Sequence, residues 1–161
     1  MDFTKLLSIQ SELDRVIMEK HGFQKKEKTK EKVLAFLVEL GELANETKCF
    51  KYWSIKPPAE REVILDEYAD GLHFLLSISL DLGIKNLETT QHKCETNKTE
   101  QFLKVYCKAN DFQKSHDFLK FMQLFTAYLN LGGCLGFSIS EIEDAYYNKN
   151  RVNHQRQENG Y

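Results

Sequence analysis

Residues 63–80 read VILDEYADGLHFLLSISL, and this stretch decides the fold that we expect for the chain. A helical projection places Glu67 and Asp70 on one stripe together with Val63 and Phe74. After Asp70 the segment is apolar on nearly every side, so this helix is expected to be buried. Ionised carboxylates on a buried stripe are costly unless they are paired or bind a metal ion. We therefore interpret Glu67 and Asp70 as candidate metal ligands.

A second pair of acids with the same spacing precedes this stretch, in the sequence Glu39-Leu40-Gly41-Glu42. Two acids three residues apart share one face of a helix, and here they lie beside an apolar face that includes Phe36. Four carboxylates from two helices would form an oxygen-rich site of the kind that suits Mg²⁺ or Mn²⁺. The alternative is that these acids are solvated helix surface or pair with Lys and Arg side chains.

The composition is typical of one soluble helical domain that covers residues 1–161. Of the 161 residues, 42% are hydrophobic and 29% are charged, and the chain has only two prolines and eight glycines. The net charge of −2 gives no support for a nucleic-acid partner or an anionic membrane surface. No apolar run reaches membrane-spanning length and no signal peptide is evident, so we expect a cytoplasmic protein.

The four cysteines, Cys49, Cys94, Cys107 and Cys134, are widely spaced, and no C-x-x-C pair occurs. Zinc sites and disulfide frameworks usually show closer or more regular spacing. We therefore expect reduced thiols in the core or on the surface rather than zinc ligands or disulfides.

Helical periodicity predicts an all-α bundle of about five to six helices. Thr29 is the expected N-cap of the second helix, and Gly132 and Gly133 are expected to break the fifth. A capping-box signature from Ser140 to Glu143 is expected to start the last helix. The expected helices cover residues 3–19, 29–48, about 59–82, 99–109, 115–131, and 140 through Tyr147.

Three other segments supply candidate ligand-binding residues. Gln10 and Asp14 share a face of the first helix with apolar neighbours, and a buried Gln amide could read the edge of a ligand. The alternative is a polar margin of an amphipathic helix.

The loop with Lys51 and Trp53 either plugs the core or forms a wall for a flat ring, with the lysine reaching a phosphate. The polar tail is either frayed or ordered by an anionic ligand, with candidate phosphate partners Lys149, Arg151 and Arg156.

Together these features indicate a phosphorylated substrate that bridges metal ions held by the acids, with the basic tail closing over it. The chain has no P-loop motif, so the phosphates of a nucleoside triphosphate would be bound without a P-loop. A di-iron bundle is a poorer match, because Asp70-x-x-His73 supplies only half of the necessary motif. A non-enzymatic helical interaction module, with all four acids solvated, stays open as a third reading.

The motifs in combination resemble the all-α, dimeric type of dUTP pyrophosphatase (dUTPase), within the all-α nucleoside triphosphate pyrophosphatase superfamily. The resemblance covers nearly the whole chain. The motifs that carry it are the two acid pairs, Gln10-x-x-Leu13-Asp14, Phe50-Lys51-Tyr52-Trp53, Asp70-Gly71-Leu72-His73-Phe74, and the tail from Tyr147 through Lys149, Asn153, Arg156 and Gln157 to Gly160-Tyr161.

The resemblance implies a homodimer that hydrolyses dUTP, and also dUDP, to dUMP, with pyrophosphate released from dUTP. A related activity on dCTP or another nucleotide is the alternative, because a Gln amide can turn over to serve cytosine.

The resemblance also implies a site for two or more Mg²⁺ ions, replaceable by Mn²⁺, at Glu39, Glu42, Glu67 and Asp70. Glu39 is the implied base for the attacking water. A uracil pocket is implied at Gln10, Trp53 and Phe74, with His73 beside it and Asp14 nearby. Phosphate or deoxyribose contacts are implied at Lys51, Lys149, Asn153, Arg156 and Tyr161.

Overall fold

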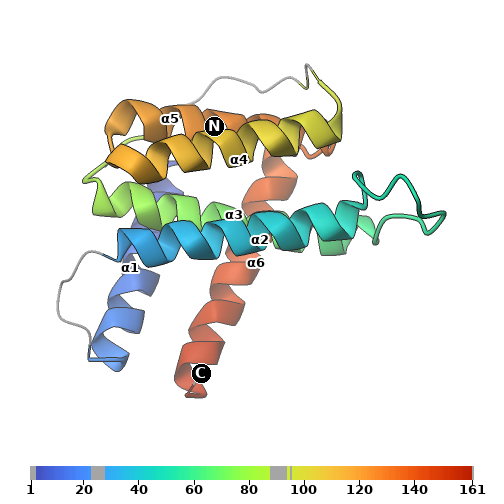
Figure 1. The fold of residues 1–161 in the computed structure, drawn as a ribbon. Helices are drawn as coiled ribbons and strands as arrows, with labels where there is room; N and C mark the ends of the chain where they lie inside the picture. Colours follow the sequence, from blue (N-terminus) through green and yellow to red (C-terminus); the bar gives the residue numbers. More distant parts are fainter. Residues whose placement is uncertain (1–2, 23–27, 88–93, 95, 161) are drawn as a thin grey trace.

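The computed structural model describes residues 3–22, 28–87, 94 and 96–160, and that part of the chain contains six α-helices and no strand (Figure 1). The prediction of an all-α bundle of five to six helices is confirmed. None of the helices in these residues is long and apolar enough to cross a lipid bilayer. The helices are α1 (Thr4–Lys20), α2 (Thr29–Thr47), α3 (Arg61–Asp81), α4 (Lys98–Ser115), α5 (Phe118–Cys134) and α6 (Ile139–Glu158).

Helix α3 is the centre of the bundle, and it contacts α1, α2, α5 and α6. From Tyr68 to Ser79 nearly all of its residues are buried, which agrees with a sequence that is apolar on almost every side. Helix α2 runs beside it, α4 and α5 pack together on one side of this pair, and α1 and α6 extend away on the other (Figure 1). Both acid pairs therefore lie on the two adjacent helices α2 and α3.

Two buried tyrosines join α3 to α5. The rings of Tyr68 and Tyr128 stack with their centroids 4.6 Å apart. Each hydroxyl donates a hydrogen bond to the backbone carbonyl of the other residue, at 3.2 Å and 2.7 Å. Gly71 and Gly132 provide the space for these rings, because a Cβ at either glycine would collide with the opposite tyrosine hydroxyl. The pair fixes the part of α3 that carries Asp70.

The ends of α4 and α5 differ from the prediction. Helix α4 extends beyond residue 109 because Phe112 continues its buried face. Helix α5 passes through Gly132 and Gly133 and ends at Cys134, so the predicted break at the two glycines is wrong. Gly132 stays helical since its missing side chain admits the Tyr68 ring.

The helix starts also differ in detail. The capping box of α6 pairs Ser138 with Glu141, two residues before the predicted one at Ser140. Thr29 is the first residue of α2 rather than its N-cap, and its hydroxyl donates to Asp81 Oδ2 at 3.1 Å. The polar tail is helical to Glu158.

Cys94 and Cys134 form a disulfide, so the prediction of four reduced cysteines is wrong for these two. Their separation of 40 residues in the sequence does not indicate a pair, but Cys94 lies beside the end of α5, where the two Cα atoms are 4.5 Å apart. Cys49 and Cys107 are free.

Candidate active site

Three acids converge where α2 packs against α3. Glu39 comes from α2, and Glu67 and Asp70 come from α3. One carboxylate oxygen from each lies within 4.8 Å of the others, and all three side chains are half-buried. Glu42 lies one turn farther along α2 and is exposed, at the margin of this acid cluster. Two adjacent helices thus bring three of the four predicted acids together.

Burial and mutual repulsion weaken the acidity of the cluster. Burial, followed by the charges of Asp70, Glu42 and Glu67, raises the pKa of Glu39 to about 7. Burial, followed by Asp70 and Glu42, raises the pKa of Glu67. Burial also raises the pKa of Asp70, although Lys149 opposes this shift. A cluster that resists full ionisation would be stabilised by a bound cation, and its oxygen donors suit Mg²⁺ or Mn²⁺.

Helix α6 supplies positive charge to the same place. Lys149 Nζ lies 2.6 Å from Asp70 Oδ2 and 2.7 Å from Asp66 Oδ2. Lys149 is buried, whereas Asp66 is exposed. The charge of Arg156, farther along α6, also lowers the pKa of Asp70. The ion pairs hold α6 against the acid-bearing part of α3.

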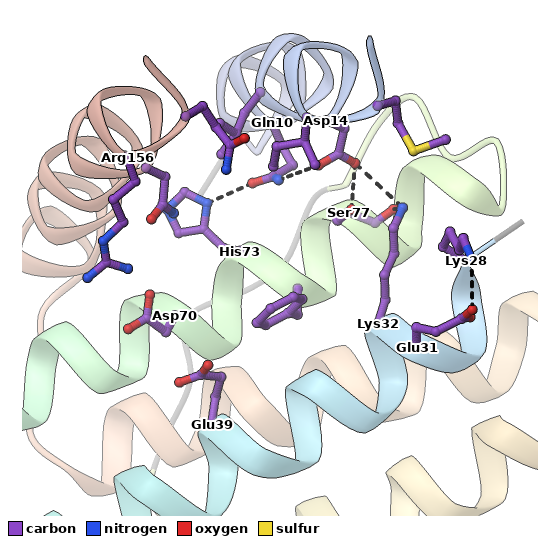
Figure 2. Close-up of a pocket in the computed structure, with 16 residues that line it drawn as sticks. Gln10, Asp14, Lys28, Glu31, Lys32, Glu39, Asp70, His73, Ser77 and Arg156 are labelled. Carbon is purple, nitrogen blue, oxygen red and sulfur yellow. Dashed lines mark hydrogen bonds and ion pairs between the residues drawn. The ribbon is translucent and has the colours of Figure 1, made fainter. Parts of the chain in front are cut away.

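A cavity of about 560 Å³ extends from the acid cluster between α1, α2, α3 and α6. Its volume is in the range of small-molecule sites. Figure 2 shows the carboxylates of Glu39 and Asp70 close together at one end, with Gln10 and Asp14 farther along. Apolar side chains from α1, namely Leu13, Ile17 and Met18, also line the cavity. The predicted site residues that line the cavity are Gln10, Asp14, Glu39, Asp70, His73, Phe74, Asn153 and Arg156.

A buried hydrogen-bond network forms the wall of the cavity away from the acids. Gln10 Oε1 lies 2.8 Å from His73 Nδ1 and 2.8 Å from the Tyr146 hydroxyl. Gln10 Nε2 donates to Asp14 Oδ1 at 2.8 Å, and Ser77 Oγ donates to Asp14 Oδ2 at 2.5 Å. The His73 ring stacks on the Tyr146 ring at 4.0 Å. Burial lowers the pKa of His73 to about 4, so its ring is neutral near pH 7.

Sequence reasoning missed three residues of this wall. Ser77 carries a buried hydroxyl in an otherwise apolar run of sequence, and this exception could have marked it as a site residue. Lys32 lies 3.6 Å from Asp14 Oδ2, but it is one of six lysines in residues 20–32, and the sequence does not distinguish it from the others. Tyr146 has no functional signal in the sequence, and only the packing of α6 on α1 reveals its hydroxyl contact.

Among the described residues, the predicted substrate contacts Lys51, Trp53 and Lys149 do not line the cavity. Lys51 and Trp53 lie in the loop between α2 and α3, and neither lines the cavity. Trp53 is 65% exposed and packs edge-on against Phe50 and Tyr52. Tyr161 lies outside the described residues.

Comparison with known proteins identifies the family. A family model described as dUTPase matches residues 2–161, nearly the whole chain. No curated protein sequence matches. The all-helical architecture and the acid cluster agree with the family match. The chain therefore belongs to the all-α dUTPase family, whose activity is the hydrolysis of dUTP.

Proposed function

We propose that this chain is a homodimer that uses Mg²⁺ to hydrolyse dUTP to dUMP and pyrophosphate, and that it also converts dUDP to dUMP. The observation that carries the proposal is one cavity with carboxylates at one end and a buried polar wall at the other. A nucleotide has the same division, with a charged polyphosphate at one end and a flat polar base at the other. With Mg²⁺ between the carboxylates and the phosphates, the cavity would suit this substrate in both charge and size.

Glu39, Glu67 and Asp70 would hold the Mg²⁺ ions, with Glu42 at the margin, and Mn²⁺ would substitute because it takes the same oxygen ligands. When bound, the ions neutralise phosphate charge and lower the pKa of a bound water. We assign Glu39 as the general base. Glu39 is the acid that α2 contributes to the cluster, and its half-buried carboxylate lines the cavity together with Asp70.

Gln10, His73 and Phe74 would form the uracil pocket, since all three line the cavity and Phe74 offers an apolar face. Asn153 and Arg156 would contact the phosphates or the deoxyribose from α6. Lys149 would serve the same purpose next to Asp70, where its ammonium group already lies.

The homodimer is supported by large apolar side chains exposed in the single chain. Leu34 and Val38 are 65% and 50% exposed and lie one turn apart on α2. Tyr52, Trp53 and Ile55 in the following loop are also exposed. Exposed apolar surface of this kind is typical of a protein interface. The proposed contact of Trp53 and Lys51 with substrate then depends on a second copy that places this loop over the cavity.

The test is pyrophosphate release from each of the four common dNTPs and dUTP with Mg²⁺. We expect selective turnover of dUTP, and a loss of about 100-fold or more in both Glu39→Gln and Asp70→Asn. Glu62→Gln is the matched control, because Glu62 is an exposed acid in the first turn of α3. Equal cleavage of all nucleotides, or full activity in both variants, would contradict the proposal. Light scattering over a concentration series measures the molar mass in solution and so tests the dimer.

A further inference from the structure

We propose that Asp14 determines the choice between uracil and cytosine, because it holds the amide of Gln10 in a single orientation. The choice of substrate rests on the proposed function, but the orientation of the amide follows from the described residues alone. Asp14 is thus a positioning residue, and Tyr146 and His73 assist it from the opposite side of the amide.

The carboxylate of Asp14 determines which end of the Gln10 amide faces it. A carboxylate accepts hydrogen bonds and donates none. The Gln10 atom 2.8 Å from Asp14 Oδ1 must therefore be the amide nitrogen. Ser77 Oγ donates to the other carboxylate oxygen, and Lys32 Nζ lies 3.6 Å from it, so the carboxylate is itself held in place.

The Gln10 amide has one hydrogen-bonding group that the protein does not use. An amide oxygen has two lone pairs and the nitrogen has two hydrogens. The His73 ring and the Tyr146 hydroxyl use both lone pairs of Gln10 Oε1, and Asp14 uses one N–H. One N–H remains. Gln10 is only 3% exposed yet lines the cavity, so it offers a ligand a single donor and no acceptor.

The orientation of the Gln10 amide also determines which ring nitrogen of His73 carries the proton. Because Nδ1 faces the amide oxygen of Gln10, the neutral ring carries its proton on Nδ1. Nε2 is then unprotonated, and it is buried with no hydrogen-bond partner among the described residues. Burial keeps the ring neutral, and it outweighs the backbone of Tyr146, which raises the pKa of the His73 ring. If the neutral ring carried its proton on Nε2 instead, Nδ1 would need a donor. The Gln10 amide would then have to turn over, which would place its oxygen against the Asp14 carboxylate.

The consequence is a base preference. Uracil has a carbonyl at position 4, where cytosine has an amino group. A lone N–H donor pairs with the carbonyl and leaves an amino group without an acceptor, and sites of this kind reject the wrong partner strongly. Thymine has the same carbonyl, so this network does not separate uracil from thymine.

The test compares kcat/KM for dUTP, dCTP and dTTP in Asp14→Asn. An amide at position 14 can donate to a turned-over Gln10, and the Tyr146 hydroxyl and His73 can both reverse their roles. We expect the dUTP-to-dCTP ratio to fall about 10- to 100-fold while the dUTP-to-dTTP ratio is unchanged. Tyr146→Phe frees one lone pair of Gln10 and should lower the first ratio about two- to fivefold. Glu12→Gln, an exposed acid on the same helix, is the control.

The nitrogen-15 chemical shifts of the His73 ring provide a measurement that needs no turnover. We expect a proton on Nδ1 in the wild-type protein and a shift toward Nε2 in Asp14→Asn. A proton on Nε2 in the wild type would overturn the amide orientation. The expected tautomer with an unchanged dUTP-to-dCTP ratio in Asp14→Asn would overturn the specificity role. The expected tautomer in a protein that does not hydrolyse dUTP would instead overturn the proposed function.

Discussion

The pKa of the Glu39 carboxyl group depends on burial and on the charges of the neighbouring acids. Burial and three neighbouring acids raise its pKa from the usual 4.5 to about 7. The folded protein therefore binds this proton more tightly than the unfolded chain does between these two values. Without divalent cations, we expect the stabilising contribution of this proton to be complete below about pH 4.5 and lost as the pH rises through about 7.

Urea unfolding in EDTA, followed across this pH range in the wild type and in Glu39→Gln, measures the effect. The wild type should lose free energy of unfolding relative to the variant as the pH rises, because glutamine carries no titrating proton. Added Mg²⁺ should reduce the loss. Parallel pH curves for the two proteins would contradict the assigned pKa.

Single residues were predictable from the sequence where helix geometry alone determines their neighbours. The spacing within each acid pair is such a case, and so is the shared face of Gln10 and Asp14. The ion pair of Lys149 with Asp70 is not, because it depends on how α6 crosses α3. The Tyr146 hydroxyl escaped prediction for the same reason.

At the scale of helices, the packing of α3 against α5 depends on a glycine. A methyl group at Gly71 would collide with the buried Tyr128 hydroxyl, which also donates to the Tyr68 carbonyl. Overpacking of this kind typically costs about 1–3 kcal/mol. We expect Gly71→Ala to lower the free energy of unfolding by about this amount, as measured by urea titration.

Gly41→Ala is the matched control, because Gly41 is also in a helix interior. Its Cβ would lie 3.3 Å from the hydroxyl of the half-buried Tyr106, which can shift. Alanine favours the helix by up to about 1 kcal/mol over glycine, so this variant should be as stable as the wild type or more stable. Equal stability of the two alanine variants would show that the tyrosine pair does not restrict α3.

The existence of each helix was predictable from periodicity, but several ends were not. Gly132 reads locally as a helix breaker, yet it remains in α5 because the Tyr68 ring needs its space. Likewise, both Ser138 and Ser140 precede a glutamate at capping-box spacing, and the chain uses the first. Tertiary contacts decide between local signals of similar strength.

At the scale of the whole molecule, the cavity and the disulfide lie in different parts of the bundle. The cavity is formed by α1, α2, α3 and α6, whereas the disulfide ties Cys94, before α4, to the end of α5. The fold class was predictable because composition and periodicity act over the whole chain. The cysteine pairing was not, because it depends on where two distant segments meet.

This separation predicts that the disulfide supports stability rather than catalysis. It closes a loop with a sequence separation of 40, for which chain entropy gives about 3–4 kcal/mol of stabilisation. We expect Cys134→Ser to lose about this much free energy of unfolding, and reduced wild type to lose the same, while Cys107→Ser is unchanged because Cys107 is a free, exposed thiol. dUTP hydrolysis well below the unfolding temperature should be retained in both variants. A loss of activity in folded Cys134→Ser would instead show that the α4–α5 side of the bundle communicates with the cavity through α3.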